Sequence, residues 1–426
     1  FWLYFSMTPQ EMSIYFEKVN RFINIDLPLP ERKTSKSAGY DFVVAEDITI
    51  DSLNYEEALQ QTADKINNGF KVIAEAAFRY ENLFIRADIL KIDVLKKEIE
   101  LHEVKAKSYS SEDNFMSVNK NTGEIKGIMS AWEGYLLDIA FQKYILQKCF
   151  PDYKINASLL MADKDSVATV HGLNQFFKLD KNGDRVSVSV DEGLTRNQLG
   201  DKILKSVNVD DEIRWIWNNP VKSKFQEGLN FTAYVEMLSN AYQQDDKLVV
   251  PIHTGCKKCQ FRTVPEKADE TALKSGFTEC WLHATGLSQQ DLQKPLVTDL
   301  WSFGFRGMSD LIDSGIYLLE NVTEELITPN STSKTVYPGL TPLERRLLQI
   351  EKSKNNDTRV YLDKEGLKRE MESWTFPLHF IDFETSRVAI PFHAGRKPYE
   401  QIAFQFSHHV VSADYSIEHK GQYISF

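Results

Sequence analysis

The sequence predicts an α/β protein of two or three domains, and three observations support this fold class. A helical pattern is followed directly by three strand patterns, two of them with clear alternation of apolar and polar residues. A second helical pattern separates these strands from later ones, so helices and strands alternate along the chain. With 426 residues, of which 42% are hydrophobic, the chain is long enough to bury more than one core.

The first predicted elements are a helix and three strands. Residues 55–68 have the helical pattern, and Gly69 ends it, as a glycine commonly ends a helix. The strand patterns that follow occupy residues 70–80, 82–92 and 98–108. The short gap between the last two strands predicts that they pair as a hairpin.

The next predicted helix spans residues 131–150, where apolar residues recur at helical spacing. Asp138 and Gln142 are four residues apart, so both lie on one face of this helix. The chain then has patterns for a strand at 155–163, for further strands within 171–190, and for helices over 195–248.

The C-terminal part follows a segment at residues 329–339 that is rich in Pro, Ser, Thr and Gly and predicts a flexible linker. Thr341 and Glu344 then fit a capping box with Pro342 at the first helical position, which predicts a helix. A last unit begins near Trp374 with the strand pattern PLHFIDFETS.

Composition narrows the class of protein. A formal net charge of −11 argues against a uniformly basic surface for nucleic acid, although it leaves a local groove open. No apolar run approaches the ~20 residues that cross a bilayer, and the opening FWLYF lacks the basic flank of a secretory signal. We therefore expect a cytoplasmic protein without a membrane partner. Because the chain begins at Phe1 and ends just after a strand pattern, we expect it to be part of a longer protein.

Two carboxylates and an ammonium form the first candidate site. Glu103 and Lys105 are two apart in a strand and share a face, while Val104 points to the core. If the preceding strand pairs across residues 91–98, Asp88 lies beside them. Two carboxylates so placed can hold Mg²⁺ or Mn²⁺, and an ammonium can activate a water for phosphodiester cleavage. The alternative is an ion pair on the surface of an edge strand.

The order of these segments carries a family resemblance. The succession IRADIL, IELHEVKAKS and DIAFQKYIL resembles the core of RecB-like nucleases of the PD-(D/E)XK superfamily, including the CRISPR-associated RecB-like exonucleases. The resemblance implies a restriction-endonuclease-like fold in which Asp88 and Glu103 bind the metal and Lys105 assists the attacking water. It also implies that Gln142 and Tyr144 correspond to a Q-x-x-Y-like motif on the following helix.

The resemblance covers roughly residues 55 to 165 and departs from the family pattern at one point. Several family members carry a His or Glu on a preceding helix as an extra metal ligand. No His occurs in the upstream segment here, and Glu75 is the nearest substitute.

Clustered cysteines form a second candidate site. Cys256, Cys259, Cys280 and His283 follow the pattern CKKC and CWLH, and three thiolates with one imidazole suit a tetrahedral Zn²⁺. The alternative is that these are structural thiols without a metal. Cys149 lies apart from them in LQKCFPD and is interpreted as a buried thiol.

The RecB-like resemblance points instead to a 4Fe-4S cluster. In many such nucleases the cluster is held by one Cys near the N-terminus and three Cys after the nuclease core, so that the chain forms a closed ring. Cys256, Cys259 and Cys280 would be the three, and the fourth ligand would lie just upstream of Phe1, because in that pattern an aromatic segment such as FWL follows it. Either metal would fasten the chain rather than cut DNA.

A second acidic pair occurs in the last predicted strand. Asp382 and Glu384 share one face of a strand that Phe380 and Ile381 are expected to anchor in a sheet, and the pair could reach a two-metal site. The alternative is a polar strand end. FIDFET is similar to the first motif of DEDD-type, RNase H-like exonucleases of the DnaQ class.

The longer segment DFETSRVAIPFHAGRKPYEQIAFQFSHHV resembles the C-terminal domain of a family of uncharacterised bacterial proteins, and LVTDLWSFGFRGMSDLIDSGIYLLENV fits the middle of that family. DEDD-type enzymes need further acidic residues downstream, and Asp414 and His419 are poor substitutes for them. We therefore expect an incomplete RNase H-like domain.

The sequence thus predicts four parts: a RecB-like nuclease domain at 1–250, a Cys-rich segment at 251–290, a helical connecting region at 291–372 and the start of an RNase H-like domain at 373–426. The leading functional hypothesis is a metal-dependent nuclease that acts on single- or double-stranded DNA in processing, repair or antiviral defence. One alternative is a nucleic-acid-binding or assembly module with an inactive nuclease core. Another is a redox or metal sensor that uses the Cys site.

Overall fold

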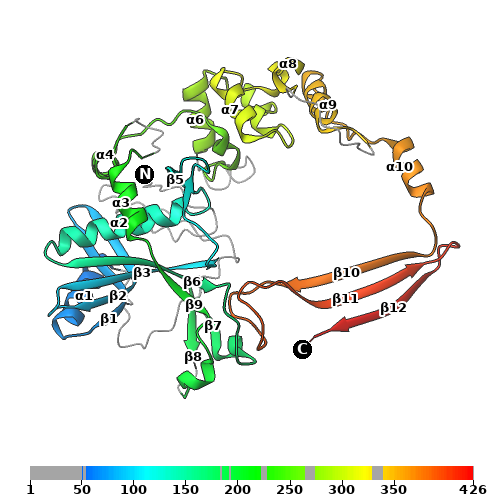
Figure 1. Ribbon diagram of the computed structural model, residues 1–426. Helices are drawn as coiled ribbons and strands as arrows, with labels where there is room; N and C mark the ends of the chain where they lie inside the picture. Colours follow the sequence, from blue (N-terminus) through cyan, green and yellow to red (C-terminus); the bar gives the residue numbers. More distant parts are fainter. Residues whose placement is uncertain are drawn as a thin grey trace.

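The computed structural model describes residues 50, 54–182, 185–190, 193–221, 228–263, 274–328 and 339–425. Helices and strands alternate in them around a central mixed sheet, which confirms the α/β class (Figure 1). The linker expected at 329–339 falls almost wholly outside the described residues, as does the FWL segment at the N-terminus. No helix in the described ranges is both long and apolar enough to span a bilayer.

A five-stranded sheet forms the first unit, in the order β1-β2-β3-β6-β9. Its strands are β1 (Val72–Tyr80), β2 (Leu83–Asp93), β3 (Glu98–Tyr109), β6 (Lys154–Asp163) and β9 (Leu204–Asn208). Only β3 and β6 pair in parallel; the other neighbours are antiparallel. A parallel pair needs a crossover, and the segment that supplies it contains the small ribbon β4 (Met116–Val118) and β5 (Ile125–Ile128) and then the helix α2 (Glu133–Cys149).

Helix α2 covers the sheet because its apolar residues recur at helical spacing. Leu136, Ile139 and Ile145 are fully buried and belong to one cluster with Leu90 and Leu101 of the strands. The helix contacts β1, β2, β3 and β6, so it lies across the middle of the sheet. Side chains on its sheet-facing side are therefore held next to residues of β2 and β3.

Helix α1 (Tyr55–Asn67) packs on β1 and follows the predicted pattern closely. The side chain of Asn54 accepts hydrogen bonds from the backbone N–H groups of Glu56 and Glu57, which satisfies two donors at the helix start. Gly69 follows the helix with φ of +80°, a conformation that glycine adopts without strain. The predicted start and end of this helix are confirmed.

The prediction for residues 195–248 is only partly right. Helices α3 (Asp210–Asn218) and α4 (Phe231–Gln244) lie there, together with the 3₁₀ turn η4 (Arg196–Leu199). Residues 204–208, however, form strand β9, which pairs with the outer edge of β6. A five-residue strand takes its place from the backbone groups of its neighbour, and its own side chains give a weak signal. The strands expected within 171–190 are present as the antiparallel pair β7 (Phe177–Asn182) and β8 (Arg185–Val190).

The middle of the chain is helical, as expected, and is built on a second buried cluster. The elements there are η5 (Thr254–Lys258), α6 (Gly276–Thr285), η6 (Asp291–Gln293), η7 (Val297–Asp299), α7 (Phe305–Asp313), η8 (Leu319–Asn321), α8 (Glu324–Ile327) and α9 (Pro342–Lys354). Trp281, Leu300 and Ile350 are buried in one cluster, and Cys256 and Cys259 pack against it. The Cys-rich segment and the following helices therefore share a core. The capping box of Thr341 and Glu344 is confirmed.

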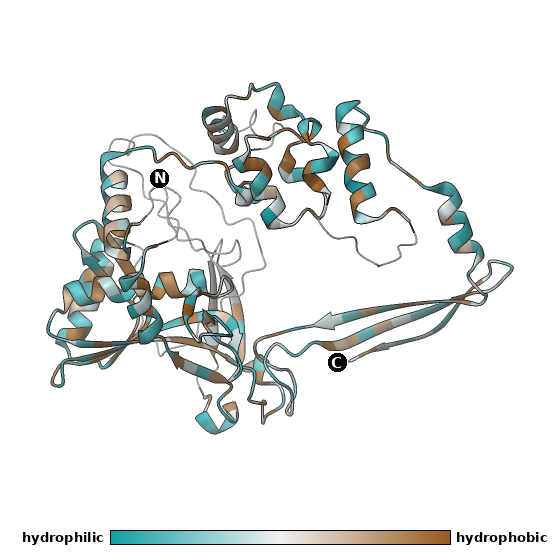
Figure 2. Ribbon diagram, turned by 45° about the horizontal axis from the view of Figure 1, so that its top comes forward, coloured by the Kyte–Doolittle hydropathy of each residue, from teal (hydrophilic) through white to brown (hydrophobic). Residues whose placement is uncertain are grey.

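The C-terminal unit consists of α10 (Lys364–Glu372), which is mostly hydrophilic in Figure 2, and a sheet of β10 (Leu378–Ser386), β11 (Ile402–Val411) and β12 (Ile417–Ile424). The loop between β10 and β11 returns to the first unit, where Gly395 N–H donates to the carbonyl of Ala168 over 2.7 Å and Gly172 N–H donates to that of Phe392 over 2.8 Å. The described elements thus follow a ring, which these two hydrogen bonds close (Figure 1).

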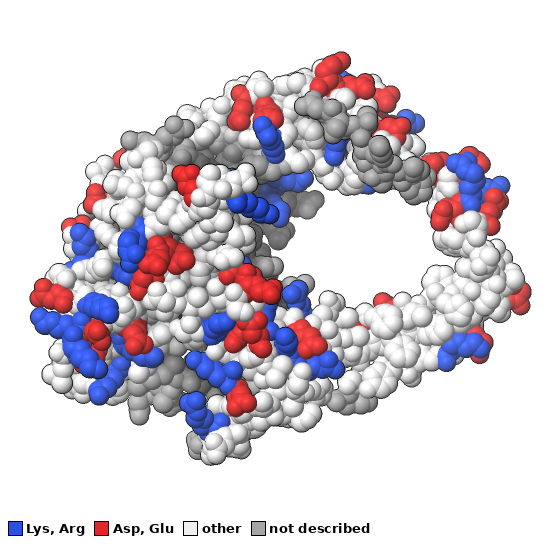
Figure 3. Space-filling view, viewed as in Figure 1, with Lys and Arg blue, Asp and Glu red and all other residues white. Residues whose placement is uncertain are grey.

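Charges are distributed unevenly on the visible surface. On the face drawn in Figure 3, Lys and Arg are interspersed with Asp and Glu over the first unit. The surface over β10–β12 carries few charges on the same face. The face drawn in Figure 3 is therefore not uniformly basic.

Candidate active site

The candidate site begins where β2 and β3 stop pairing. Their antiparallel ladder ends at the pair of Ile89 and His102, so the next residues are Asp88 on β2 and Glu103 on β3. The carboxylate of Asp88 accepts a hydrogen bond from the backbone N–H of Val104 over 2.6 Å. At Val104 the carboxylate of Asp88 thus takes the place of the β2 backbone as a hydrogen-bond acceptor for β3. This hydrogen bond holds the carboxylate at the fork between β2 and β3.

Glu103 and Lys105 point together from β3, as strand alternation predicts. Lys105 Nζ lies 2.8 Å from Glu103 Oε1. Both side chains are buried, with 9% of Lys105 and 8% of Glu103 exposed to solvent. The predicted alternative of a pair on the surface of an edge strand is therefore wrong, because β3 is flanked by β2 and β6 and the pair is covered.

Helix α2 completes the cluster from above the sheet. Lys105 Nζ lies 2.6 Å from Asp138 Oδ2, and Gln142 Nε2 donates to Glu103 Oε2 over 2.7 Å. Gln142 Nε2 also reaches Asp138 Oδ1 at 3.4 Å, which is the expected contact between residues four apart. Asp138 was not among the predicted site residues, and its shared face with Gln142 was the signal that could have identified it.

Glu75 approaches the cluster from β1. The pairs of Ala74 with Ile89 and Ala76 with Ala87 place Glu75 opposite Asp88. Its backbone has φ of +57°, which is uncommon for a residue with a side chain. Its carboxylate forms an ion pair with Arg86 Nε at 3.5 Å. Glu75, the expected substitute for an extra metal ligand, therefore lies opposite Asp88, but its carboxylate is paired with Arg86.

Carboxylates crowd this buried space, and their pKa values reflect that. Burial raises the pKa of Asp88 to about 7, against the lowering effects of Lys105 and of the Val104 N–H. Burial, followed by the charge of Asp88, raises the pKa of Glu103 well above its ordinary value. Burial disfavours the charge on Lys105, but the carboxylates of Asp138 and Glu103 outweigh this effect and raise the pKa of Lys105.

The cluster is rich in carboxylate oxygens, the ligand type that hard divalent cations use. Asp88, Glu103 and Asp138 place three carboxylates around a single ammonium, and their mutual repulsion shows an excess of negative charge. Within the described ranges, no group of three or more His, Cys, Asp or Glu side chains is placed so that it could hold a metal ion by itself. Mg²⁺ does not need such a group, because it commonly uses one or two carboxylates and completes its shell with water and substrate phosphate. Asp88 and Glu103 would be its protein ligands.

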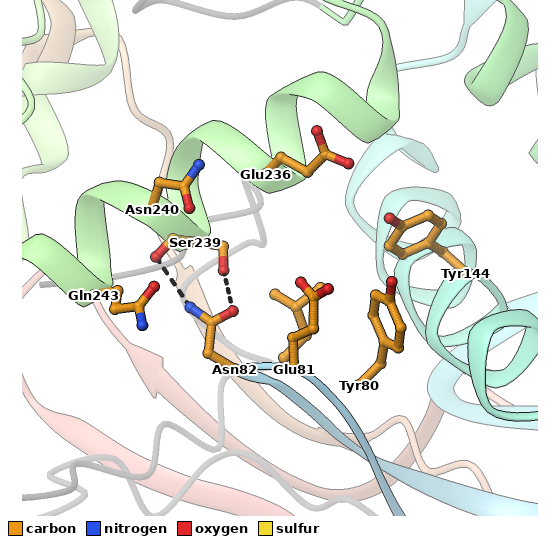
Figure 4. Close-up of a pocket in the computed structure, with 9 residues that line it drawn as sticks. Tyr80, Glu81, Asn82, Tyr144, Glu236, Ser239, Asn240 and Gln243 are labelled. Carbon is orange, nitrogen blue, oxygen red and sulfur yellow. Dashed lines mark hydrogen bonds between the residues drawn. The ribbon is translucent and has the colours of Figure 1, made fainter.

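Tyr144 does not join the cluster. It lies two residues after Gln142, and two residues turn a helix by roughly 200°, so the two side chains leave α2 on different sides. Tyr144 instead lines a separate cavity with Tyr80, Glu81 and Glu236 (Figure 4). The structure therefore brings together Asp88, Glu103, Lys105 and Gln142 of the predicted site, and leaves Tyr144 out.

Comparison with known proteins gives one match, and it lies in the last unit. Residues 379–425 match a family described as Domain of unknown function (DUF2779). This DUF2779 segment is a small part of the chain, so the match does not assign the whole chain to a family. Neither the curated proteins nor the solved structures yield a match.

The DUF2779 segment contains the second predicted acidic pair. Asp382 pairs with Ser407 and Glu384 with Gln405 across β10 and β11, which confirms that the two carboxylates share a face. The prediction that Phe380 and Ile381 anchor the strand is wrong: they are 55% and 51% exposed. Adjacent strand residues point to opposite faces, and among the described residues neither face of this sheet is covered at that point.

The downstream substitutes do not approach this pair in a way that completes a site. Asp414 accepts hydrogen bonds from the N–H and the hydroxyl of Ser416, so it stabilises the turn between β11 and β12. His419 lies beside His409, with Nδ1 and Nε2 separated by 3.3 Å. The described residues of the DUF2779 segment thus contain the pair of Asp382 and Glu384 without a partner cluster.

The Cys site is partly brought together. Cys256 lies in η5, and its carbonyl accepts the N–H of Cys259 over 3.2 Å. Burial raises the pKa of the Cys259 thiol, the N–H of Phe261 lowers it, and Cys280 raises it, so the thiol of Cys280 in α6 lies close enough to act on Cys259. His283 follows Cys280 by three residues on α6 and is exposed.

Cys149 lies apart from the other cysteines, as expected. Its thiol is partly buried and donates to the carbonyl of Arg79 over 3.4 Å. Burial raises the pKa of this thiol.

Proposed function

We propose that Asp88, Glu103 and Lys105 form the active site of a metal-dependent DNA nuclease with a RecB-like, restriction-endonuclease-like core. The observation that carries the proposal is their convergence at the fork of β2 and β3 with Gln142 from α2. Residues from two strands of a hairpin and from the later helix α2 meet in one buried acidic cluster, which a purely structural ion pair does not require.

Each residue has a distinct role in this proposal. Asp88 and Glu103 would hold Mg²⁺ or Mn²⁺, which supplies Lewis-acid stabilisation of the phosphodiester and lowers the pKa of a water. Lys105 positions the attacking water through its ammonium, whose charge Glu103 and Asp138 maintain. Gln142 donates to Glu103 and orients its carboxylate. Asp138 competes with the water for the ammonium and so sets its position.

A cleavage assay tests the proposal. Purified protein is incubated with fluorescently labelled single- and double-stranded DNA in the presence of Mg²⁺, Mn²⁺ or a chelator. We expect cleavage that needs the metal and that falls on the order of 10³-fold when Glu103→Gln is combined with Lys105→Ala. Glu100→Gln is the matched control, because Glu100 lies on the same strand but pairs with Lys91 at the surface.

The same assay separates the nuclease from a binding module. The ammonium of Lys105 already neutralises two carboxylates, Glu103 and Asp138. If this ammonium keeps the metal out, the core would bind DNA without cutting it. Gel-shift binding by the wild type without cleavage under any divalent metal would select that alternative. Cleavage that persists in the double variant would overturn the site assignment.

For the Cys site we propose a structural 4Fe-4S cluster, with Zn²⁺ as the alternative. The proposal is supported by the nearness of Cys280 in α6 to Cys259, which follows Cys256 in η5 by three residues. Absorbance and metal analysis of anaerobically purified protein distinguish the two: iron with a broad visible band selects the cluster, and zinc in a colourless sample selects the tetrahedral site with His283.

A further inference from the structure

A cavity of about 610 Å³ opens between the turn that joins β1 to β2 and the helices α2 and α4. None of the residues that line it belongs to the acidic cluster at Asp88. In Figure 4 the side chains of Tyr80, Glu81, Tyr144 and Glu236 converge on it from these three elements. A concave site with a few convergent polar groups is the usual form of a binding site for a small molecule.

Tyr144 gives the cavity an unmet hydrogen-bonding group. Its side chain is buried, with 8% of the residue exposed, and its ring packs edge-on against Phe231 at 6.4 Å between centroids. Its hydroxyl is directed at the cavity in Figure 4 and forms no hydrogen bond within the described part of the chain. A tyrosine hydroxyl at the wall of a cavity can donate to or accept from a ligand that binds there.

The lining of the cavity is negative and aromatic. Glu81 and Glu236 supply two carboxylates, and their charges raise the pKa of Tyr80, with Glu81 as the largest cause. An inorganic ion fits the cavity poorly, because a volume of about 610 Å³ is far larger than a metal ion with its coordinating oxygen atoms. The two carboxylates suit a larger cation that spreads its charge over donors and carbon.

Lys148 shows that the rings accept a cation. Its ammonium lies 5.5 Å from the ring centre of Tyr80 and 5.4 Å from that of Tyr144, within the range of cation–π attraction. Lys148 is exposed and is not among the lining residues, so it stands at the rim of the cavity. Its position shows that the rings of Tyr80 and Tyr144 attract a positive charge. Its own charge repels a second cation.

The floor of the cavity is fixed in place. Asn82 Nδ2 donates to the carbonyl of Ser239 over 3.2 Å, and the hydroxyl of Ser239 donates to Asn82 Oδ1 over 2.7 Å. This pair of hydrogen bonds ties the β1–β2 turn to α4, which carries Glu236. A cavity whose walls are tied together in this way loses little conformational entropy when a ligand binds.

We propose that this cavity binds an organic cation through an ammonium or guanidinium group. This group donates hydrogen bonds to the carboxylates of Glu236 and Glu81 and packs against the rings of Tyr80 and Tyr144. Such a group is carried by a polyamine and by a Lys or Arg side chain of a partner protein. The hydroxyl of Tyr144 pairs with the same ligand or with the water that it retains. The proposal does not depend on nuclease activity.

Isothermal titration calorimetry of the full chain with spermidine, agmatine and N-acetyl-arginine amide tests the proposal. We expect saturable binding at one site that Glu236→Gln weakens at least about tenfold, since one charge-assisted hydrogen bond is lost. Tyr144→Phe weakens it less, and Lys148→Met strengthens it by removing a like charge. Binding of spermidine and agmatine alone identifies a polyamine site, and binding of all three identifies a site that also takes side chains.

The control is Glu365→Gln, which changes the net charge equally at the exposed first turn of α10. Equal weakening by Glu236→Gln and Glu365→Gln, or binding that does not saturate, would show a general attraction to an acidic protein and overturn the proposal. Binding of adenosine without any of the cations would overturn it too. If Glu236→Gln does not fold, Lys148→Met decides, because unchanged affinity in that variant contradicts a cation in the cavity.

Discussion

Replacing Lys105 with Met measures how much the ammonium contributes to holding the acidic cluster together. Lys105 contacts Glu103 at 2.8 Å and Asp138 at 2.6 Å, and its side chain is 9% exposed. Met has a similar length and no charge, so the variant fills the same space. It leaves the carboxylates of Glu103 and Asp138 without their cation in a buried position.

The expected loss follows from this burial. Removing one partner of a buried ion pair costs about 3–5 kcal/mol, because the remaining charge is left uncompensated. For a unit of 150–250 residues, 1 kcal/mol corresponds to about 2–4 °C, so the melting temperature of the first unit should fall by roughly 6–20 °C. Lys91→Met is the matched control: it removes a pair with Glu100 in which both side chains are about half exposed, and it should cost below about 1 kcal/mol.

The loss should depend on pH. The pKa of Asp88 is raised to about 7, so the folded protein binds a proton between about pH 4 and pH 7 that the unfolded chain has released. Stability therefore falls as pH rises through this window. Without Lys105 the pKa of Asp88 rises further, and the difference between variant and wild type should be larger at about pH 8 than at about pH 6.

Thermal melting at both pH values, with and without Mg²⁺, checks this reasoning. A divalent cation should restore part of the stability of Lys105→Met, because it supplies the missing positive charge. A loss of the same size at both pH values and no response to Mg²⁺ would refute the reasoning, since the ammonium would then contribute through packing alone.

Three further outcomes are expected. Asp210→Asn should destabilise the fold by about 3–5 kcal/mol near neutral pH, because the Asp210 carboxylate accepts hydrogen bonds from Lys143 Nζ over 2.6 Å and from the Ala157 N–H over 2.9 Å. The pKa of Asp210 is lowered in the folded protein, so the stability that its carboxylate contributes should vanish as pH falls below about 4. Urea unfolding of the variant and the wild type at several pH values measures this difference in stability. Mn²⁺ affinity should rise as pH rises through about 7, because binding displaces the protons that Asp88 and Glu103 hold at their raised pKa values. Calorimetry in buffers of different ionisation enthalpy counts the protons that are released. Cys256→Ser should lower the iron or zinc content of anaerobically purified protein, and unchanged metal content would remove Cys256 from the ligand set.

The strand part of the candidate site was predictable because strand geometry is local. Alternation alone places Glu103 and Lys105 on one face, and a short connection between β2 and β3 brings Asp88 to the same end of the sheet. The fork at Ile89 and His102 was not predictable, because the end of a ladder depends on which backbone groups find other partners.

The helical part was predicted less well. The spacing of four residues between Asp138 and Gln142 was visible, but which face of α2 meets the sheet is decided by packing. That choice recruited Asp138 and excluded Tyr144, which the family resemblance had included. Two residues apart on a helix cannot both face one site, and the spacing in DIAFQKYIL already contained that fact.

In the last unit the pattern predicted pairing but not burial. The strand PLHFIDFETS is confirmed as β10, yet the sheet leaves Phe380 and Phe383 more than half exposed. Alternation reports which residues share a face, and it carries no information on what covers that face. The resemblance of this unit to RNase H-like exonucleases stays a prediction.

The position of Mn²⁺ in crystals, located by anomalous diffraction, tests the central claim most directly. Our account predicts an anomalous peak within bonding distance of one carboxylate oxygen of Asp88 and one of Glu103, with Lys105 Nζ displaced toward a metal-bound water. A peak elsewhere, or an ordered Lys105 that keeps both carboxylate contacts at saturating Mn²⁺ with the fork empty, would contradict it.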